Sequence, residues 1–220
     1  MKNFTFLFSF LLLFGCKENS EKKIVNKSKK ENIIYTKELS NDKYIFNFSY
    51  VKDSLNPEIT RFKEISIIER NRNLEIQIIK IDTIEMNERN MFFSIDTDIN
   101  FDGYNDLCVL NYEGNYNNSY SYWLFNEKNN NFQHYKGLDN IYNPEVISEK
   151  KIICSKWHSG VSSFYLEKYF WNKDSLILKE KFEESWTDKG HLTVTKLIKG
   201  KYTVKDSIIK DNLVMFMKCR

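Results

Sequence analysis

The stretch Tyr44-Ile45-Phe46-Asn47-Phe48-Ser49-Tyr50 decides the fold class, because an aromatic side chain stands at every second position. Successive side chains of a β-strand point to opposite faces of a sheet. The alternation therefore predicts a strand with one face buried and the other facing solvent. A helix would need apolar residues about 3.6 positions apart, which this stretch lacks.

The same pattern continues along the chain from about residue 41. Alternating segments lie at 74–78, 164–170, 192–194 and 202–204, and short apolar runs at 65–68, 92–95, 122–125 and 152–154. The chain has only 7 Gly and 2 Pro, so Asn, Asp and Lys must make most turns, as at 71–73, 129–131 and 172–174. The clearest hairpin joins 164–171 to 176–182. These features predict an all-β fold, an antiparallel β-sandwich or open barrel built from hairpins, with no helix of ordinary length.

The N-terminus has the layout of an export signal. A short basic start, Met1-Lys2-Asn3, precedes the apolar run 4–14, and a polar stretch follows from Lys17. The apolar run is too short to span a bilayer as a helix, which takes about 20 residues. The sequence predicts a signal peptide at 1–15, a flexible tether at 16–40 and a single β domain at 41–220.

Leu13-Phe14-Gly15-Cys16 resembles the lipobox of bacterial lipoproteins, although Phe14 is larger than the residue usual there. The resemblance implies that Cys16 is acylated and becomes the new N-terminus. Two or three acyl chains suffice for stable membrane anchoring. Lys17 favours delivery to the outer membrane, with the periplasmic face preferred over the cell surface.

Three cysteines remain for the folded part: Cys108, Cys154 and Cys219. One disulfide is compatible with export, but the sequence does not choose the pair. The formal net charge of +3 and the absence of a basic stripe argue against a nucleic-acid binder.

The most specific internal motif is the acidic loop at 98–107, where oxygen ligands recur at alternate positions. Its candidate calcium ligands are Asp98, Asn100, Asp102, the backbone carbonyl of Tyr104, and Asp106. Gly103 permits a sharp turn. Val109 stands where an EF-hand has its last acidic ligand, so the loop looks more like the Asp-rich loops of integrin-type β repeats. The other interpretation is an Asn/Asp turn whose side chains bond their own backbone.

No catalytic motif accompanies this loop. The histidines His134, His158 and His191 lie in no metalloprotease frame, and no nucleophile elbow is present. Cys154 and His158 could meet only across a sharp turn. We therefore expect a binding protein and not an enzyme.

One resemblance suggests a function. The lipobox, the acidic loop, the segment Tyr122-Trp123-Leu124-Phe125 and Trp157-His158-Ser159-Gly160, followed by the hairpin after Phe164, resemble periplasmic immunity lipoproteins. These proteins protect Xanthomonas-type bacteria from type IV-secreted peptidoglycan hydrolases and are related in fold to inhibitors of invertebrate-type lysozyme. The resemblance covers roughly residues 92–182.

The resemblance implies an inhibitor loop that enters a lysozyme-like cleft. Ser159 and Gly160 match the Ser-Gly turn of such inhibitors, while the nearby tyrosine falls later than usual, at Tyr165. The alternative function is a calcium-stabilised, non-catalytic binding or adhesion module at the envelope, which would present an aromatic face to glycan or protein. Tyr116 and Tyr120 belong to the aromatic cluster that such a face would use.

Overall fold

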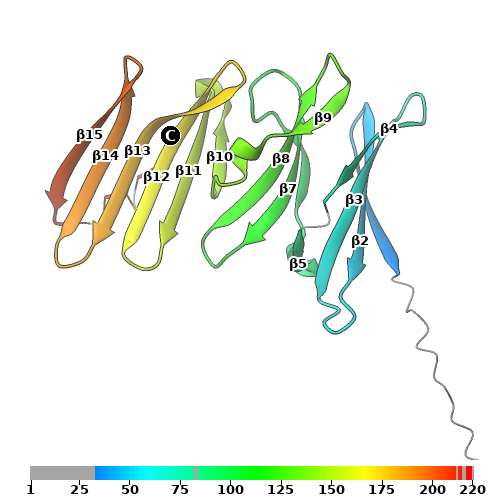
Figure 1. Cartoon of the computed structure of the whole chain (residues 1–220), viewed down its shortest axis with the longest axis horizontal. Helices are drawn as coiled ribbons and strands as arrows, with labels where there is room; N and C mark the ends of the chain where they lie inside the picture. The colour runs from blue at the N-terminus through cyan, green and yellow to red at the C-terminus, as the bar shows by residue number, and fades with distance from the viewer. Residues whose placement is uncertain (1–32, 82–83, 212, 215–216, 220) are drawn as a thin grey trace, which may run out of the picture. The chain divides into compact units, whose positions relative to one another are not determined.

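The computed structural model describes residues 33–81, 84–211, 213–214 and 217–219. Over these residues the protein is all-β, with three antiparallel sheets and three single-turn 3-10 helices (Figure 1). The predicted all-β fold built from hairpins is confirmed, and the sheets do not close into a barrel. The predicted signal peptide and Cys16 lie outside the described residues. No described helix is both long and apolar enough to cross a membrane.

Sheet A has the strand order β1-β2-β3-β4, with β5 paired to β3. Its strands are β1 (Ile34–Ser40), β2 (Tyr44–Lys52), β3 (Ile59–Glu69), β4 (Leu74–Lys80) and β5 (Glu85–Asn87), followed by the 3-10 helix η1 (Glu88–Asn90). Because β1 pairs with β2 along its whole length, the last seven residues of the predicted tether are strand. The β domain therefore begins before residue 41, and that boundary was placed too late.

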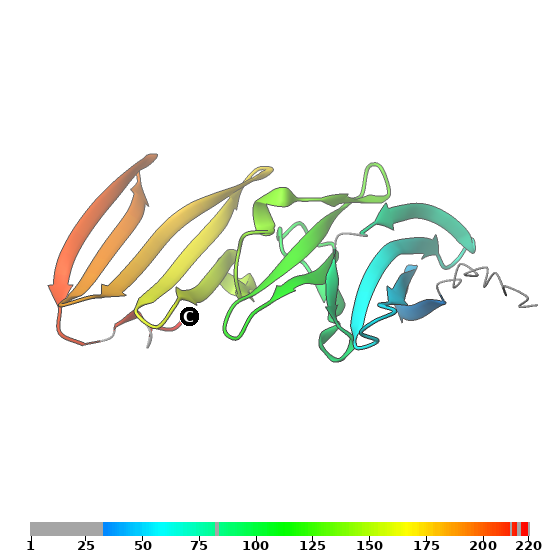
Figure 2. The same ribbon diagram turned by 60° about the horizontal axis from the view of Figure 1, so that its bottom comes forward.

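Sheet B has the order β6-β7-β8-β9 and carries the acidic loop between its first two strands. Its strands are β6 (Phe93–Thr97), β7 (Asp106–Glu113), β8 (Asn118–Asn126) and β9 (Asn131–His134), followed by η2 (Lys136–Leu138). In both views this sheet lies between the other two (Figures 1 and 2).

Sheet C is a meander in which each strand pairs with the next along the chain. Its elements are β10 (Pro144–Ile147), η3 (Ser148–Lys150), β11 (Ile152–Ser159), β12 (Ser163–Asn172), β13 (Ser175–Trp186), β14 (Gly190–Ile198) and β15 (Lys201–Ile209). The predicted hairpin is β12–β13, with Asn172 opposite Ser175.

Two apolar cores join the sheets through sheet B. One core packs rings of β2 and β3, such as Phe48 and Phe62, against Phe93 and Val109 of sheet B. The other packs Cys108 from the opposite face of β7 against Ile153 and neighbouring residues of sheet C. Since sheet B is covered on both faces, residues 106–110 are all buried, which explains the uninterrupted apolar run 107–110.

Each of the three predicted Asn/Asp/Lys turns contains a residue in the left-handed backbone region. These residues are Asn73 (φ 47°), Asn130 (φ 49°) and Lys173 (φ 54°). Asn tolerates this region better than most residues, which accounts for two of the three turns in a chain so poor in glycine.

Candidate functional site

The Ser159-Gly160 turn projects from the end of sheet C. Strand β11 ends at Ser159, which lies opposite Ser163, the first residue of β12. Gly160 has φ 67°, a conformation that favours glycine, and Val161 next to it is 95% exposed. The Ser-Gly turn predicted from the sequence is therefore a hairpin turn, and its apolar residue Val161 is exposed to solvent.

A second turn braces this hairpin from sheet B. The Asn117 side chain donates from Nδ2 to the His158 carbonyl (2.7 Å) and accepts from the His158 N–H at Oδ1 (3.2 Å). The ring of Tyr116 lies 4.3 Å from that of His158, and His158 Nδ1 lies 2.8 Å from the Gly160 carbonyl oxygen. The β7–β8 and β11–β12 turns thus form one unit, called here the tip (residues 114–117 and 158–163).

The side chain of Asn143 forms a second set of hydrogen bonds that supports the tip. Its Nδ2 donates to the carbonyls of Tyr116 and Lys156, both at 2.8 Å, and its Oδ1 accepts from the Asn118 N–H at 2.9 Å. Asn143 also has φ 45°, in the left-handed region. The sequence analysis did not identify Asn117 and Asn143, because most of their partners are distant in the sequence and no local pattern marks these residues.

Tyr165 is not part of the turn itself. It lies in β12 opposite Trp157, with the two rings stacked at 3.9 Å and 10°, and Lys181 Nζ lies 5.0 Å from its ring centroid. Because side chains alternate along a strand, Tyr165 and Ser159 share one face of the hairpin. The structure brings them onto one surface, with Tyr165 set back from the tip.

In the acidic loop, three of the predicted calcium ligands gather. Asp98 accepts the N–H groups of Asp102 (3.1 Å) and Gly103 (2.9 Å), and Asn100 Nδ2 donates to Asp102 Oδ2 (2.8 Å). Asp102 Oδ1 in turn accepts the Tyr104 N–H at 2.9 Å. These contacts show the backbone-bonded turn that was the alternative interpretation, with Asp98, Asn100 and Asp102 close together.

Asp106 takes a different position from the other predicted ligands. It is the first residue of β7, is 1% exposed, and accepts the Ile99 N–H on Oδ2 and the Phe125 N–H on Oδ1, both at 2.9 Å. Burial raises the pKa of this carboxyl to about 7, although the two hydrogen bonds oppose the shift. Asp106 thus connects the acidic loop to β8 through these two hydrogen bonds.

The histidines and cysteines of the described part of the chain lie in separate environments. Among those residues, no three or more His, Cys, Asp or Glu side chains are grouped so that they could hold a metal ion. His134 Nε2 lies 2.9 Å from Asp139 Oδ1, and its ring packs near Trp123. Cys154 is oxidised, so a thiol pair with His158 is excluded in this form of the protein.

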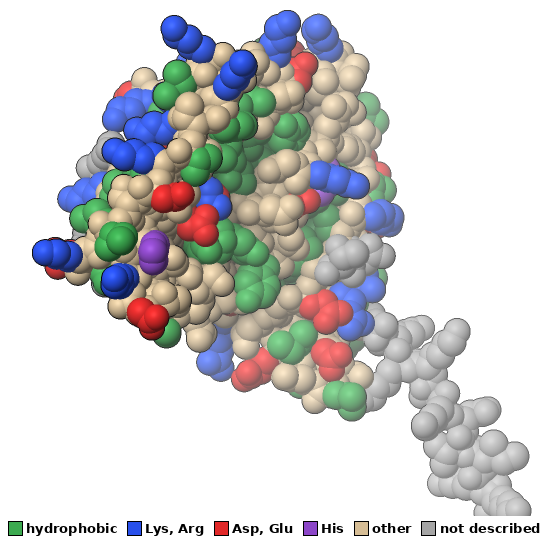
Figure 3. All heavy atoms as spheres, turned by 60° about the vertical axis from the view of Figure 1, so that its left-hand side comes forward, with side chains coloured by type: hydrophobic (Ala, Val, Ile, Leu, Met, Phe, Trp, Pro, Cys, Tyr) green, Lys and Arg blue, Asp and Glu red, His purple; other side chains and the backbone are tan. Residues whose placement is uncertain are grey.

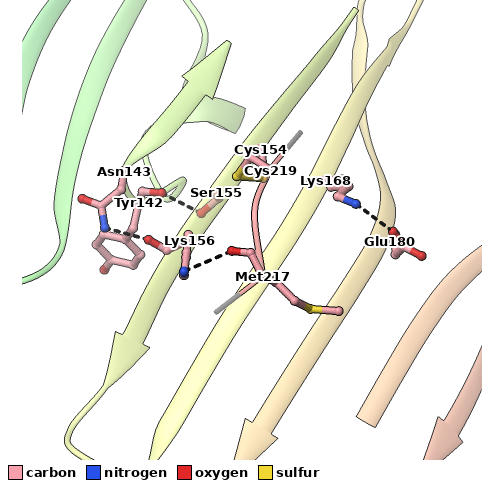
Figure 4. Close-up of a disulfide and its surroundings, with 9 residues drawn as sticks. All are labelled: Tyr142, Asn143, Cys154, Ser155, Lys156, Lys168, Glu180, Met217 and Cys219. Atoms are coloured by element: carbon pink, nitrogen blue, oxygen red, sulfur yellow. Dashed lines mark hydrogen bonds and ion pairs between the residues drawn. A yellow bond between two sulfur atoms is a disulfide. The ribbon is translucent and has the colours of Figure 1, made fainter. Parts of the chain in front are cut away.

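The disulfide joins Cys154 of β11 to Cys219, while Cys108 is free and buried. Burial raises the pKa of the Cys108 thiol to about 12. The C-terminal segment crosses the face of sheet C, where Lys156 Nζ donates to the Met217 carbonyl at 3.1 Å (Figure 4). The buried Glu184 accepts the Leu213 and Val214 N–H groups.

The surface around the outer strands of sheet C carries no uniform charge. The view onto this side shows lysine and arginine side chains interspersed with acidic and apolar ones (Figure 3). Exposed apolar residues on β15 include Tyr202, Val204 and Ile208.

Comparison with known proteins gives a likeness of fold. No family model and no curated protein sequence matches the chain. A solved structure described as "Structure of a Xanthomonas Type IV Secretion System related protein" is similar, with a TM-score of 0.58 and 17% sequence identity. The match covers 83% of this chain and 95% of that one. At this identity the likeness shows a shared fold.

Proposed function

We propose that the chain is an exported envelope lipoprotein that binds and inhibits a lysozyme-like peptidoglycan hydrolase, acting as a binding protein and not as an enzyme. The observation that carries the proposal is the tip, a turn with a 95% exposed Val161 held by a hydrogen-bonded neighbouring turn. The likeness in fold to a Xanthomonas type IV secretion system related protein also supports this proposal.

The tip has the properties that an inhibitor needs. Ser159 is exposed and carries a hydroxyl that can donate to a catalytic carboxylate. Val161 in the same turn and the 71% exposed Tyr116, whose ring packs against His158, offer apolar contacts to the walls of a cleft. Because Asn117 and the His158–Gly160 contact already fix both turns, little conformational entropy is lost on binding.

The test is inhibition of a panel of lysozyme-like hydrolases by the full chain and by tip variants. Val161→Asp places a charge where an apolar contact is expected and should weaken inhibition by about tenfold or more, since each 1.4 kcal/mol of binding free energy corresponds to about tenfold. Ser159→Trp should have a similar effect through steric exclusion. Both positions are exposed, so the melting temperature should stay close to that of the parent.

The matched control is Leu55→Asp. Leu55 is 94% exposed and lies between β2 and β3 of sheet A, so the same chemical change is made on another sheet. Inhibition should be unchanged in this variant. If the parent inhibits no enzyme of the panel, or if Val161→Asp and Ser159→Trp inhibit as well as the parent, the proposed tip is wrong.

The lipid anchor is proposed at Cys16, with the protein at the periplasmic face of the outer membrane. Two or three acyl chains would hold the inhibitor where incoming hydrolases act. We expect the parent protein in the membrane fraction and Cys16→Ser in the soluble fraction. A Cys16→Ser variant that stays in the membrane fraction would contradict lipid anchoring at this residue.

Calcium is proposed as a structural ion in the acidic loop. Asp98, Asn100 and Asp102 already lie close together and carry the oxygen atoms that calcium prefers, with the Tyr104 carbonyl nearby in the chain. Asp106 fits this set less well, because its carboxylate is 1% exposed and accepts backbone N–H groups from Ile99 and from Phe125 of β8. An ion that binds only the folded state raises stability by mass action.

We therefore expect calcium to raise the melting temperature of the full chain and Asp102→Ala to abolish the rise. Asp188→Ala, in the exposed β13–β14 turn, is the control and should keep it. Identical melting curves in calcium and in chelator would show that the loop is held by its own hydrogen bonds alone.

A further inference from the structure

A cleft lies at the opposite end of sheet C from the tip. Strand β12 (Figure 1) runs from Ser163, beside the tip, to Asn172. The β12–β13 turn that follows borders the cleft. The cleft also borders the acidic loop and the β8–β9 turn, and its volume is about 650 Å³. Sites for small ligands commonly measure about 300–1,000 Å³.

The aromatic side chains of the cleft are fixed by bonds made away from it. Trp171 Nε1 donates to the Ile99 carbonyl at 2.8 Å, and the Tyr135 hydroxyl accepts the Leu176 N–H at 3.0 Å. These two rings pack edge to face at 4.8 Å. The Trp171 N–H is therefore occupied and the Tyr135 hydroxyl already accepts one hydrogen bond, so both rings are fixed in place beside the cleft.

The polar side chains of the cleft carry both signs of charge. Asp102, Glu127 and Asp174 supply carboxylates, and Lys128 and Lys173 supply ammonium groups. The side-chain amides of Asn126 and Gln133 add neutral donors and acceptors. The near balance of charge disfavours a strongly charged ligand, and the mixture of donors and acceptors suits a ligand with many hydroxyl groups.

We propose that this cleft binds an uncharged oligosaccharide. A sugar ring offers an apolar C–H face to an aromatic ring and hydroxyl groups to carboxylates and amides, and the cleft supplies both kinds of partner. A nucleic acid would need a surplus of basic residues, which the cleft lacks. This binding activity is independent of hydrolase inhibition and uses none of the tip residues.

The test is a titration of the full chain with three neutral trisaccharides: triacetylchitotriose, cellotriose and maltotriose. Binding is followed by calorimetry and by tryptophan fluorescence, since Trp171 borders the cleft. We expect at least one trisaccharide to bind at concentrations up to ~10 mM, which detects Kd values of about 1 mM or below. Asp174→Ala should weaken that binding about tenfold, as expected for loss of a hydrogen bond to a charged group.

Asp188→Ala is the matched control, because it removes a carboxylate from the next turn of sheet C, outside the cleft. It should bind the trisaccharide like the parent. Absence of binding for all three trisaccharides, or equal affinity of the parent and Asp174→Ala, would overturn the proposal. Val161→Asp should leave saccharide binding intact, so failure of the cleft and failure of the tip are distinguishable.

Discussion

At the residue scale, Asp106 shows how one buried carboxylate can organise a loop. Its two oxygens accept the N–H groups of Ile99 and Phe125, which belong to the acidic loop and to β8. A buried N–H group left without an acceptor costs about 1–3 kcal/mol. The carboxylate is suited to this position because it offers acceptors on both sides and carries no donor when ionised.

Asp106→Asn should therefore destabilise the fold. An amide has one oxygen, so one of the two N–H groups would face an NH₂ group in place of an acceptor. We expect the free energy of unfolding to fall by about 1–3 kcal/mol. Urea denaturation at about pH 8, where the carboxyl with its pKa of about 7 is mostly ionised, measures this. The loss should persist in chelator because it arises from protein hydrogen bonds. A loss confined to calcium-containing buffer would identify Asp106 as a calcium ligand instead.

The sequence predicted that several residues of the candidate sites lie in turns, but it could not give the directions of their side chains. The acidic loop and the Ser159-Gly160 turn were recognised because turn chemistry is local. Asp106 points inward because it bonds the Phe125 N–H of β8, and Asn117 bonds His158 of β11. Both partners are distant in the sequence. Side-chain direction at such positions is decided by packing.

At the element scale, strands with one buried face were predicted well, whereas the exposed edge strand β1 was not. Strand β2 alternates buried and half-buried side chains over most of its length, as its sequence indicates. Strand β1 lies at the edge of sheet A and is mostly exposed, so selection for apolar residues at alternate positions is absent. For this reason its residues were assigned to the tether.

Salt bridges centred on Glu180 link three neighbouring strands of sheet C. Glu180 Oε2 accepts from Lys168 Nζ at 3.2 Å, and Glu180 Oε1 accepts from Lys196 Nζ at 2.6 Å, which links β12, β13 and β14. Partial burial tends to raise the pKa of Glu180, but the hydrogen bonds from the two lysines outweigh it and the pKa is lowered. The ionised form is therefore favoured in the folded state.

A group with a lowered pKa stabilises the fold above its unfolded pKa and loses that contribution as the pH falls through its folded pKa. Glu180→Gln should reduce the free energy of unfolding at pH 7 by up to about 1 kcal/mol, since the pair is only partly buried. The difference from the parent should shrink at about pH 3, where the parent carboxylate is being protonated. A difference of the same size at both pH values would show that packing, and not charge, is responsible.

At the scale of the whole molecule, the described residues form two apolar cores that join the three sheets and a third between sheet C and the C-terminal segment. The number of sheets and cores could not be predicted from the sequence. The apolar run 107–110 indicated a strand buried on both faces, but not which sheets cover it. For the same reason the sequence does not choose which two of the three cysteines form the disulfide. Cys108 lies in the doubly covered β7, while Cys154 and Cys219 meet because the C-terminal segment crosses sheet C.

This C-terminal segment closes over an apolar surface of sheet C. Val214 is fully buried against a cluster that includes Leu166, and Phe182 packs beside it. Glu184 is buried as well, and the segment supplies two of its hydrogen-bond donors, from Leu213 and Val214. Release of the segment would expose apolar side chains and deprive a buried carboxylate of donors, so the disulfide should contribute to the stability of the whole fold.

Cys219→Ser should lower the free energy of unfolding by about 2–4 kcal/mol, the usual contribution of a disulfide. The cysteines are 65 residues apart, so the bond restricts a long loop of the unfolded chain. Urea denaturation of the full chain with and without reductant measures the effect. Reductant should destabilise the parent and leave Cys219→Ser unchanged, which separates the disulfide from other effects of the substitution. Equal stability of the oxidised parent and the variant would mean that the hydrogen bonds to Glu184 and the apolar contacts hold the segment without the covalent link.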